Sequence, residues 1–541
     1  MPAGDGEPGV VSQVSHEEEN LCYDPQTSDG IVHYSRLSGM QISLLELPTE
    51  SPGSDHWRGI GRQRRFDSEF QTLSTIATRC PSVVSALPTI IGIKELMKIL
   101  PFRGYRYNPE IIGRLDDVIS PPYDQFKEGL DDLLFARHRY NMAHLIVNKE
   151  TLADTEASNR YTRSRALLDS WLEQRVFVQD REPSLYPYFQ MYETAGSSKT
   201  RKGFIALGEV TDYAQKIVLP HERTLSKPKQ DRLNLLRSTL ADTGLVLMLY
   251  SDPAGEIENL LASATARAAD MRALDLNGEE NQLWRISDAS WVERIAALMA
   301  GKQVIIADGH HRYEVARLFS QEIANRAAAN PCWKLYRYKL MSFIRLESEG
   351  ITIFPIHRLL HSLKEFDAPA LLKRMNEHFV VEEYPVAAGD QFTTLDFLMQ
   401  SSKRQQQAGS NAFVLYLPGL KKFALIKLRA GIAEKLVWPA DKSVAWRKLD
   451  VSVLHVVILG RLLGIGEQQL AEQTNVEYVS HHADAVKLAD AKQYQCAVLM
   501  NATPIEQVKE VVEAGDILPQ KSTHFHPKLM EGLVFARHCA G

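Results

Sequence analysis

The chain has 541 residues, of which 44% are hydrophobic and 24% charged, and its formal net charge is −5 at pH 7. This composition is ordinary for a soluble protein with sizeable cores, and the length corresponds to about two to four domains. The acidic balance argues against a dedicated nucleic-acid-binding protein, which is usually basic.

Five scattered cysteines form no C-x-x-C pair, which indicates reduced, intracellular usage instead of a disulfide framework or a zinc site. The acidic start of the chain lacks the apolar segment of a secretory signal. No uncharged apolar run reaches the roughly 18 residues of a membrane span. We therefore expect a cytoplasmic protein that acts on a small-molecule substrate, without a nucleic-acid or membrane partner.

The first part of the chain differs in composition from the rest. Residues 1–88 are rich in Gly, Pro, Ser and charged residues, which predicts a mostly disordered N-terminal extension. Residues 31–47 have the pattern of one or two short strands. A basic cluster over residues 58–65 is interpreted as a solvated surface, with ligand docking as the alternative.

A core domain is expected over residues 89–363. Apolar periodicity predicts helices at 95–100, 126–138 and 158–173. Alternating or aromatic-rich patterns predict strands at 186–193 and 204–210.

Two prolines precede the first candidate site residues of this domain. Pro121 and Pro122 hold the backbone in an extended or turned conformation. The segment either presents Tyr123 and Asp124 to a substrate or forms a plain surface turn. We count Tyr123 and Asp124 as candidate substrate-binding residues.

The segment 219–232, LPHERTLSKPKQDR, concentrates charge after a predicted strand. Pro220 and Pro228 predict a loop here, followed by a helix at 233–241. A solvated charged loop is one interpretation. An anion or metal site is the other, with His221 and Glu222 as catalytic groups and Arg223, Lys227, Lys229 and Arg232 as contacts to a phosphate-bearing cofactor.

The stretch 301–318, GKQVIIADGHHRYEVARL, carries the most specific functional pattern. Residues 304–307 have the pattern of a buried strand, and a helix is predicted from Tyr313 onward. We call residues 308–312 between them the DGHHR turn; such a turn directs backbone N–H groups and a helix N-terminus at an anion. The candidate catalytic residues are Asp308, His310 and His311, and the candidate cofactor contacts are Gly309 and Arg312.

Alternatives to these roles remain open. The two histidines also fit structural hydrogen bonds, and Arg312 also fits an ion pair such as one with Glu314.

The last third of the chain adds further candidates. His357 and Arg358 follow a predicted strand and a proline, where they either bind substrate or cap the strand. Residues 364–430 predict a small α+β unit inserted into the core, and residues 431–541 a C-terminal part that completes it. In the tail, Lys521, Ser522, Thr523 and Lys528 form a third patch for an anionic cofactor. The expected fold is α/β to α+β, with a mixed central sheet and flanking helices.

Several motifs resemble one uncharacterised family. PFRGYRYNPE, VISPPYD, YNMAHLIV, IIADGHHRYEVA, GITIFPIHR and LDVSVLH occur in order within about residues 100–534. Together they resemble the family called domain of unknown function 1015. The DGHHR turn alone is similar to the nucleotide-binding turn of the ParB and sulfiredoxin-like fold, which includes free-serine kinases. His310 and His311 stand where sulfiredoxin needs a cysteine, so sulfiredoxin chemistry is not expected.

Phosphoryl transfer needs cations and donors around the phosphate, usually a divalent metal, and a base near the acceptor. The chain supplies these residue types without a Walker-type glycine loop. We predict a kinase-like small-molecule phosphotransferase that uses ATP, ADP or pyrophosphate with Mg²⁺, with free serine as the acceptor by analogy. One alternative is a metal-assisted phosphohydrolase, for which the sequence leaves the metal ligands unknown; the other is a non-catalytic nucleotide-binding regulatory module.

Overall fold

The computed structural model describes residues 35–37, 40–42, 97–194, 196–222, 226–327, 335–386, 390–491 and 494–538. The chain divides into two compact units, Met1–Ala86 and Leu87–Gly541. In the first, β1 (Ser35–Leu37) and β2 (Met40–Ile42) form an antiparallel pair inside the stretch predicted to contain short strands. The predicted disorder of the extension and its basic cluster lie outside the described residues.

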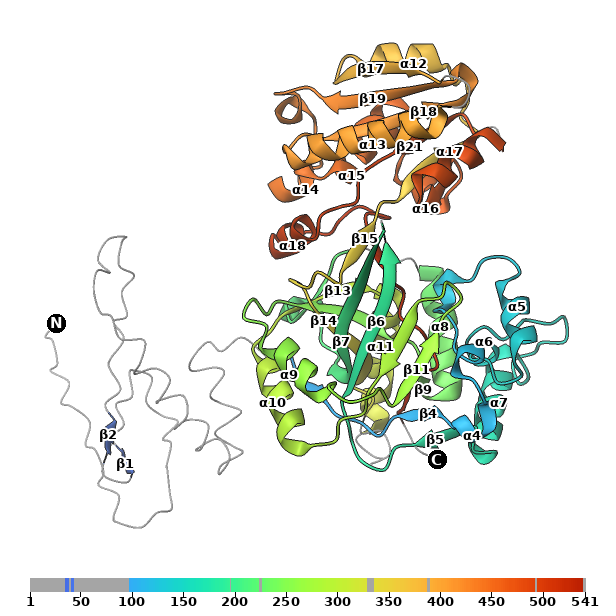
Figure 1. Ribbon diagram of the computed structural model, residues 1–541, viewed down its shortest axis with the longest axis vertical. Helices are drawn as coiled ribbons and strands as arrows, with labels where there is room; N and C mark the ends of the chain where they lie inside the picture. The colour runs from blue at the N-terminus through green and yellow to red at the C-terminus, as the bar shows by residue number, and fades with distance from the viewer. Residues whose placement is uncertain are drawn as a thin grey trace, which may run out of the picture. The chain divides into compact units, whose positions relative to one another are not determined.

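A nine-stranded sheet is the centre of the second unit (Figure 1). Its strands run in the order β11-β12-β6-β7-β14-β10-β13-β8, with β3 beside β7. β10 and β14 pair in parallel, as do β13 and β8, and the other pairs are antiparallel. The predicted mixed central sheet is confirmed. The strands are β3 (Ile99–Leu100), β6 (Tyr186–Thr194), β7 (Ser197–Glu209), β8 (Val218–Pro220), β10 (Val246–Tyr250), β11 (Met271–Leu274), β12 (Glu280–Leu283), β13 (Val304–Asp308) and β14 (Tyr338–Arg345).

Apolar side chains cover both faces of the middle of this sheet. On β10, Val246 and Met248 join the core cluster of α9 and α10, whereas Leu247 and Leu249 join the cluster of the opposite face. Burial on both faces explains why such strands are continuous apolar runs in the sequence. The flanking helices are α7 (Arg160–Glu173), α8 (Ser226–Thr239), α9 (Glu256–Ala264), α10 (Ala289–Ala300) and α11 (His310–Ala327), and the shorter α4 (Pro109–Ile112), α5 (Leu130–Arg137) and α6 (Ala143–Ile146).

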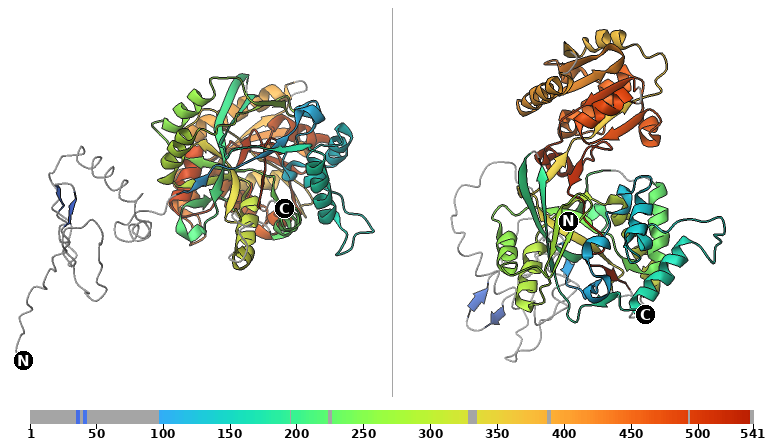
Figure 2. Two further views of the ribbon diagram at one scale, coloured as in Figure 1. Left: turned by 90° about the horizontal axis from the view of Figure 1, so that it is seen from below. Right: turned by 45° about the vertical axis from the view of Figure 1, so that its right-hand side comes forward.

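A second, antiparallel sheet has six strands in the order β17-β19-β18-β21-β16-β20. Figure 2 shows its orange and red segments as a layered body of their own. The strands are β16 (His357–Leu360), β17 (Phe379–Pro385), β18 (Ala412–Leu417), β19 (Lys422–Leu428), β20 (Val476–Val479) and β21 (Cys496–Leu499).

Helices pack on both faces of the six-stranded sheet. α13 and α17 share one core cluster with β18 and β21, and α12, α15 and α18 share the other. α15 is followed directly by a π-helix over Leu454–Leu462. The helices are α12 (Ala368–Met375), α13 (Gln391–Gln407), α14 (Val444–Lys448), α15 (Asp450–Val453), α16 (Glu467–Glu472), α17 (His482–Ala491) and α18 (Ile505–Glu513).

Residues 364–430 supply β17, β18 and β19, and segments on either side of them supply the other three strands of this sheet. The domain boundaries at residues 363 and 430 stay a prediction. Three short pairs complete the described strands: β4 (Tyr105–Tyr107) with β5 (Phe177–Gln179), β9 (Ala241–Asp242) with β23 (Ala536–Arg537), and β15 (Thr352–Phe354) with β22 (His524–His526).

Two local predictions were wrong. Ile99 and Leu100 form a strand instead of part of a helix, because they pair with Gly208 and Leu207 of β7. The charged segment after β8 is not a loop throughout, since α8 begins at Ser226. Pro228 lies in the first turn of α8, where its missing N–H leaves no helical hydrogen bond unmade.

Candidate functional site

The DGHHR turn has the predicted strand–turn–helix geometry. β13 ends at Asp308 and α11 begins at His310, slightly earlier than expected. Gly309 between them has φ +90°, and a Cβ at this position would lie 3.0 Å from Arg312 Nε. Glycine is required here by the backbone angle and by the close approach of the guanidinium.

Asp308 is held between two cations. Its carboxylate lies 3.2 Å from Arg312 Nη2 and 3.5 Å from Lys528 Nζ. Burial acts to raise the pKa of Asp308, but Lys528, Arg312 and His310 outweigh it and hold the pKa well below its ordinary value. Arg312 also lies 3.6 Å from Asp124. The turn thus combines an ionised carboxylate with cations that suit phosphate oxygens.

His221 and His310 form a buried pair beside the turn. Their ring centroids are 4.5 Å apart, and the His221 backbone N–H donates to His310 Nε2 at 3.3 Å. His221 Nδ1 lies 2.5 Å from the Ile306 carbonyl, which can only accept, so Nδ1 carries the proton. Nε2 of His221 then accepts from the Thr523 hydroxyl at 2.8 Å. Burial lowers the pKa of both imidazoles, which keeps them neutral at pH 7.

The tail predicted as an anion patch passes along the same site. The Leu518 N–H donates to the His221 carbonyl at 2.9 Å, and the Lys521 N–H donates to Glu222 Oε1 at 3.3 Å. The structure therefore brings His221, Glu222, the DGHHR turn, Thr523 and Lys528 together. Ser522 is turned inward, where its hydroxyl donates to the Pro519 carbonyl.

His311 lies toward Asp124 and two lysines of the neighbouring elements. Burial lowers its pKa, Asp124 opposes this shift, and Lys229 and Lys521 add to it. Tyr123 lies under the guanidinium of Arg232, 4.3 Å from ring centroid to carbon, and burial raises its pKa to about 12. Arg223 and the side chain of Lys227 lie outside the described residues.

His357 and Arg358 follow β15 and Pro355 as predicted, but both side chains are buried in β16. The Arg358 guanidinium donates to the Lys521 carbonyl at 2.8 Å and to Met500 Sδ at 2.9 Å. Burial lowers the pKa of Arg358 to about 10. In this position Arg358 fixes the backbone of the tail, and its role in substrate binding stays a prediction.

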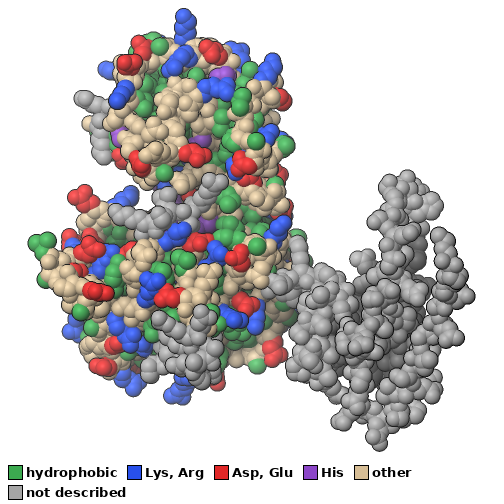
Figure 3. Space-filling model, turned by 180° about the vertical axis from the view of Figure 1, so that it is seen from behind, with side chains coloured by type: hydrophobic (Ala, Val, Ile, Leu, Met, Phe, Trp, Pro, Cys, Tyr) green, Lys and Arg blue, Asp and Glu red, His purple; other side chains and the backbone are tan. Residues whose placement is uncertain are grey.

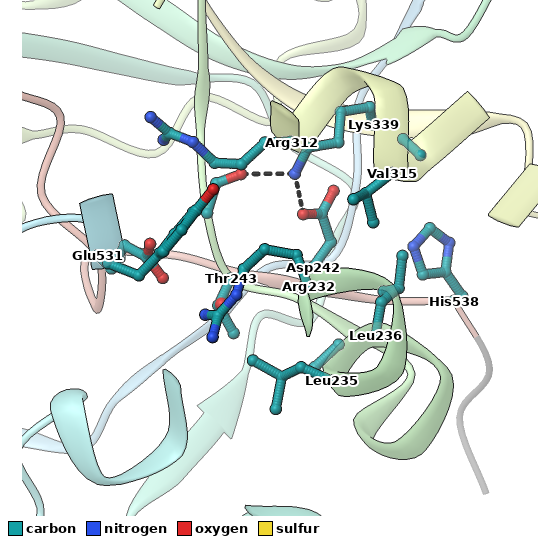
Figure 4. A pocket seen from close by; sticks show the side chains of 14 residues that line it. Arg232, Leu235, Leu236, Asp242, Thr243, Arg312, Val315, Lys339, Glu531 and His538 are labelled. Carbon is teal, nitrogen blue, oxygen red and sulfur yellow. Dashed lines mark hydrogen bonds and ion pairs between the residues drawn. The ribbon is translucent and has the colours of Figure 1, made fainter. Parts of the chain in front are cut away.

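A small cavity of about 60 Å³ lies behind the turn (Figure 4). Lys339 crosses it to bind Asp242 and the Gly244 carbonyl. Glu531 faces Arg312 there, and burial raises the pKa of its carboxyl group. The volume suits one or two water molecules and is too small for a nucleotide. A second cavity, of about 370 Å³, lies between residues 106–116 and 270–272 and contains none of the predicted site residues.

Arg201 on β7 is a site residue that the sequence pattern did not predict. It is 2% exposed, donates to Gln190 Oε1, and has no carboxylate within 4 Å among the described residues. Burial lowers the pKa of Arg201, and Tyr188, Tyr192, Asp308 and Glu279 oppose this shift. Gln190 in turn donates to the Lys528 carbonyl at 2.9 Å. Arg201 therefore adds positive charge behind Asp308 and helps to fix the segment that carries Lys528.

The described residues contain no group of three or more His, Cys, Asp or Glu side chains arranged to hold a metal ion. Within the described ranges, no helix has the length and hydropathy to cross a bilayer. Over the coloured part of the face in Figure 3, acidic and basic side chains are interspersed.

Comparisons with known proteins identify a family and a set of structural neighbours. The family model described as "Protein of unknown function (DUF1015)" matches residues 99–452. No curated protein matches the chain.

The structural neighbours include a conserved hypothetical protein from Pyrococcus furiosus, with 12% identity, a TM-score of 0.27, and coverage of 57% of this chain and 87% of that one. A free serine kinase in complex with AMP has 13% identity, a TM-score of 0.28, and coverage of 57% and 83%. SbnI from Staphylococcus aureus, with a C-terminal truncation, has 11% identity, a TM-score of 0.28, and coverage of 60% and 85%.

Proposed function

We propose that this chain, which belongs to the family described as "Protein of unknown function (DUF1015)", is a small-molecule phosphotransferase centred on the DGHHR turn. The observation that carries the proposal is the position of Asp308 between Arg312 and Lys528, 3.2 and 3.5 Å away, at the end of β13 and just before α11 begins at His310. A phosphate donor needs the cations and the helix N-terminus, and an acceptor hydroxyl needs the ionised carboxylate.

In this proposal the donor is ATP, ADP or pyrophosphate. Its terminal phosphate binds to Arg312, Lys528 and the backbone N–H groups that follow Gly309. Arg201 strengthens this positive field from behind Asp308. Mg²⁺ fits the same place, since it commonly binds one or two carboxylates together with substrate phosphates, and Asp308 and Asp124 both face Arg312.

The proposed acceptor is a small hydroxylated metabolite, with free serine as the first candidate by analogy. Asp308 accepts a hydrogen bond from the acceptor hydroxyl and directs its oxygen at the phosphorus. The neutral imidazole of His221 lies close by, and its Nε2 can receive a proton through the Thr523 hydroxyl that donates to it. Asp124, Lys229 and Lys521 lie around His311. Together with Tyr123, which packs under Arg232, they are the proposed contacts to the rest of the substrate.

The test is turnover by the purified protein, followed by phosphorus NMR, with each donor, with and without Mg²⁺, and with serine and other hydroxylated acceptors. Asp308→Asn should lower turnover by about 100-fold or more without changing the circular dichroism spectrum. Glu322→Gln, near the far end of α11 and paired with Arg237, is the matched control. Phosphate release over many turnovers without an acceptor would indicate a hydrolase, and nucleotide binding without turnover would indicate a binding module; either outcome overturns the proposal.

A further inference from the structure

One hydroxyl group of the chain is already paired with a base at this site. The Thr523 hydroxyl donates to His221 Nε2 at 2.8 Å. The other ring nitrogen of His221 donates to the Ile306 carbonyl at 2.5 Å, which fixes the tautomer and the ring orientation. A hydroxyl, a base within hydrogen-bond reach and a third group that orients the base are the parts of an activated nucleophile.

Thr523 also lies close to the proposed phosphate position. His221, which holds its hydroxyl, stacks edge-on against His310 of the DGHHR turn. The same tail segment reaches Asp308 through Lys528 five residues later. Thr523 is only partly buried, whereas Ser522 beside it is 3% exposed and donates to Pro519. The two neighbouring hydroxyls are therefore distinct, and Thr523 is the one directed at the site.

The environment of His221 allows it to take up a proton transiently. Burial lowers its pKa, so that it is neutral and able to accept. The carboxylates of Glu222 and Asp308 oppose that shift and would stabilise the imidazolium that forms. In phosphoryl transfer such a base assists the attack, while most of the stabilisation of the transition state comes from the positive charge around the phosphate.

We propose that Thr523 is a phosphoryl acceptor and that the chain phosphorylates itself at this residue. The inference rests on the proposed phosphotransfer activity. Thr523 Oγ1 attacks the terminal phosphorus of the bound donor, and its hydroxyl proton moves to His221 Nε2. The new bond between oxygen and phosphorus forms as the bond from that phosphorus to the bridging oxygen breaks. The leaving nucleotide, or phosphate in the case of pyrophosphate, keeps the electron pair of the broken bond.

The experiment uses the full chain incubated with ATP, ADP or pyrophosphate and Mg²⁺, without an added acceptor. Intact-mass and peptide mass spectrometry should detect one phosphoryl group on the peptide that contains Thr523. Thr523→Val should lose the modification, and Thr393→Val, an exposed threonine on α13, should keep it. His221→Gln should slow the modification by about 100-fold, the usual range for losing a general base.

Acid treatment separates the possible sites, since phosphothreonine survives it and phosphohistidine does not. Label lost in acid or mapped to another residue overturns the inference, as does an unmodified wild type. The donor-induced rise in melting temperature and the turnover with added acceptor are measured on the same samples. If Thr523 stays unmodified while donor binding and turnover occur, the inference fails alone; if binding and turnover are also absent, the proposed function fails with it.

Discussion

Gly309 shows how one residue sets the geometry of the site. Its φ of +90° and the 3.0 Å approach of Arg312 Nε leave no room for a side chain. Gly309→Ala should lower the free energy of unfolding by about 1–3 kcal/mol, and it should weaken phosphate binding because Arg312 is displaced. Gly278→Ala is the matched control, since Gly278 has φ +81° with open space around it. Urea unfolding and calorimetric titration with phosphate compare them; equal affinities in the two variants would contradict the role of Gly309.

Arg201 should matter more for phosphate affinity than for the free energy of unfolding. It is buried without a carboxylate within 4 Å among the described residues, an arrangement that contributes little to stability. Arg201→Met removes this buried charge but leaves Gln190 Oε1 without its donor, so the free energy of unfolding should change by no more than about 1–3 kcal/mol, while phosphate binding becomes clearly weaker. Lys202→Met, the next residue along β7, serves as the control in the same titrations. A large loss of stability with unchanged affinity would show that Arg201 is structural.

The sequence predicted the DGHHR turn because a strand pattern, a polar turn and a helical pattern are all local features. It did not predict Arg201 or Glu531 as neighbours of Arg312 and Asp308. Arg201 lies in the middle of a long strand, and its contact with Gln190 depends on how β7 pairs with β6. The sequence pattern placed the start of the second strand at residue 204, whereas β7 begins at Ser197 and pairs there with Thr194, the last residue of β6, so the hairpin that brings Arg201 opposite Gln190 was missed.

At the scale of elements, α11 is anchored by one tyrosine. Tyr313 is buried, donates to the Thr211 carbonyl at 3.0 Å and accepts from the Thr211 N–H at 2.9 Å. Tyr313→Phe leaves both backbone groups unpaired and should cost about 1–3 kcal/mol of folding free energy. Phosphate affinity should be retained, because the DGHHR turn is unchanged. Tyr384→Phe, whose hydroxyl donates to the exposed Glu382, should cost less than about 0.5 kcal/mol in the same urea titrations.

Long periodic elements such as α7 and β6 lie within a few residues of their predicted bounds, since hydrophobic periodicity dominates there. The predicted and observed secondary structures differ where a tertiary contact or the chemistry of a helix end determines the local conformation. Ile99 and Leu100 are a strand because β7 offers them a partner. Ser226 starts a helix although Pro228 follows, because the first turn tolerates proline.

At the scale of the whole molecule, buried histidines predict acid sensitivity. Burial lowers the pKa of His357, His455 and His524 to about 3 and also lowers that of His221 and His310. Below about pH 6.5 the unfolded chain binds protons that the folded chain excludes. Stability should therefore fall as the pH drops below this value, by roughly 1 kcal/mol per pH unit for each such histidine.

Urea unfolding between pH 7.5 and 5 measures this slope. His455→Phe should flatten it by the contribution of one histidine. A free energy of unfolding that is constant over this range would contradict the prediction.

Neighbouring strands of the six-stranded sheet come from distant parts of the sequence, which predicts how two fragments of the chain would behave. A cut beside Val437, which is 78% exposed between β19 and α14, would leave strands β16 and β18 in one piece and their partner β21 in the other. β22 and β23 of the C-terminal piece also pair with strands of the first piece. Two separately expressed fragments should thus reassemble by complementation and co-elute. Neither half alone should bind phosphate, because Arg312 belongs to one and Lys528 to the other, and the two meet only at Asp308.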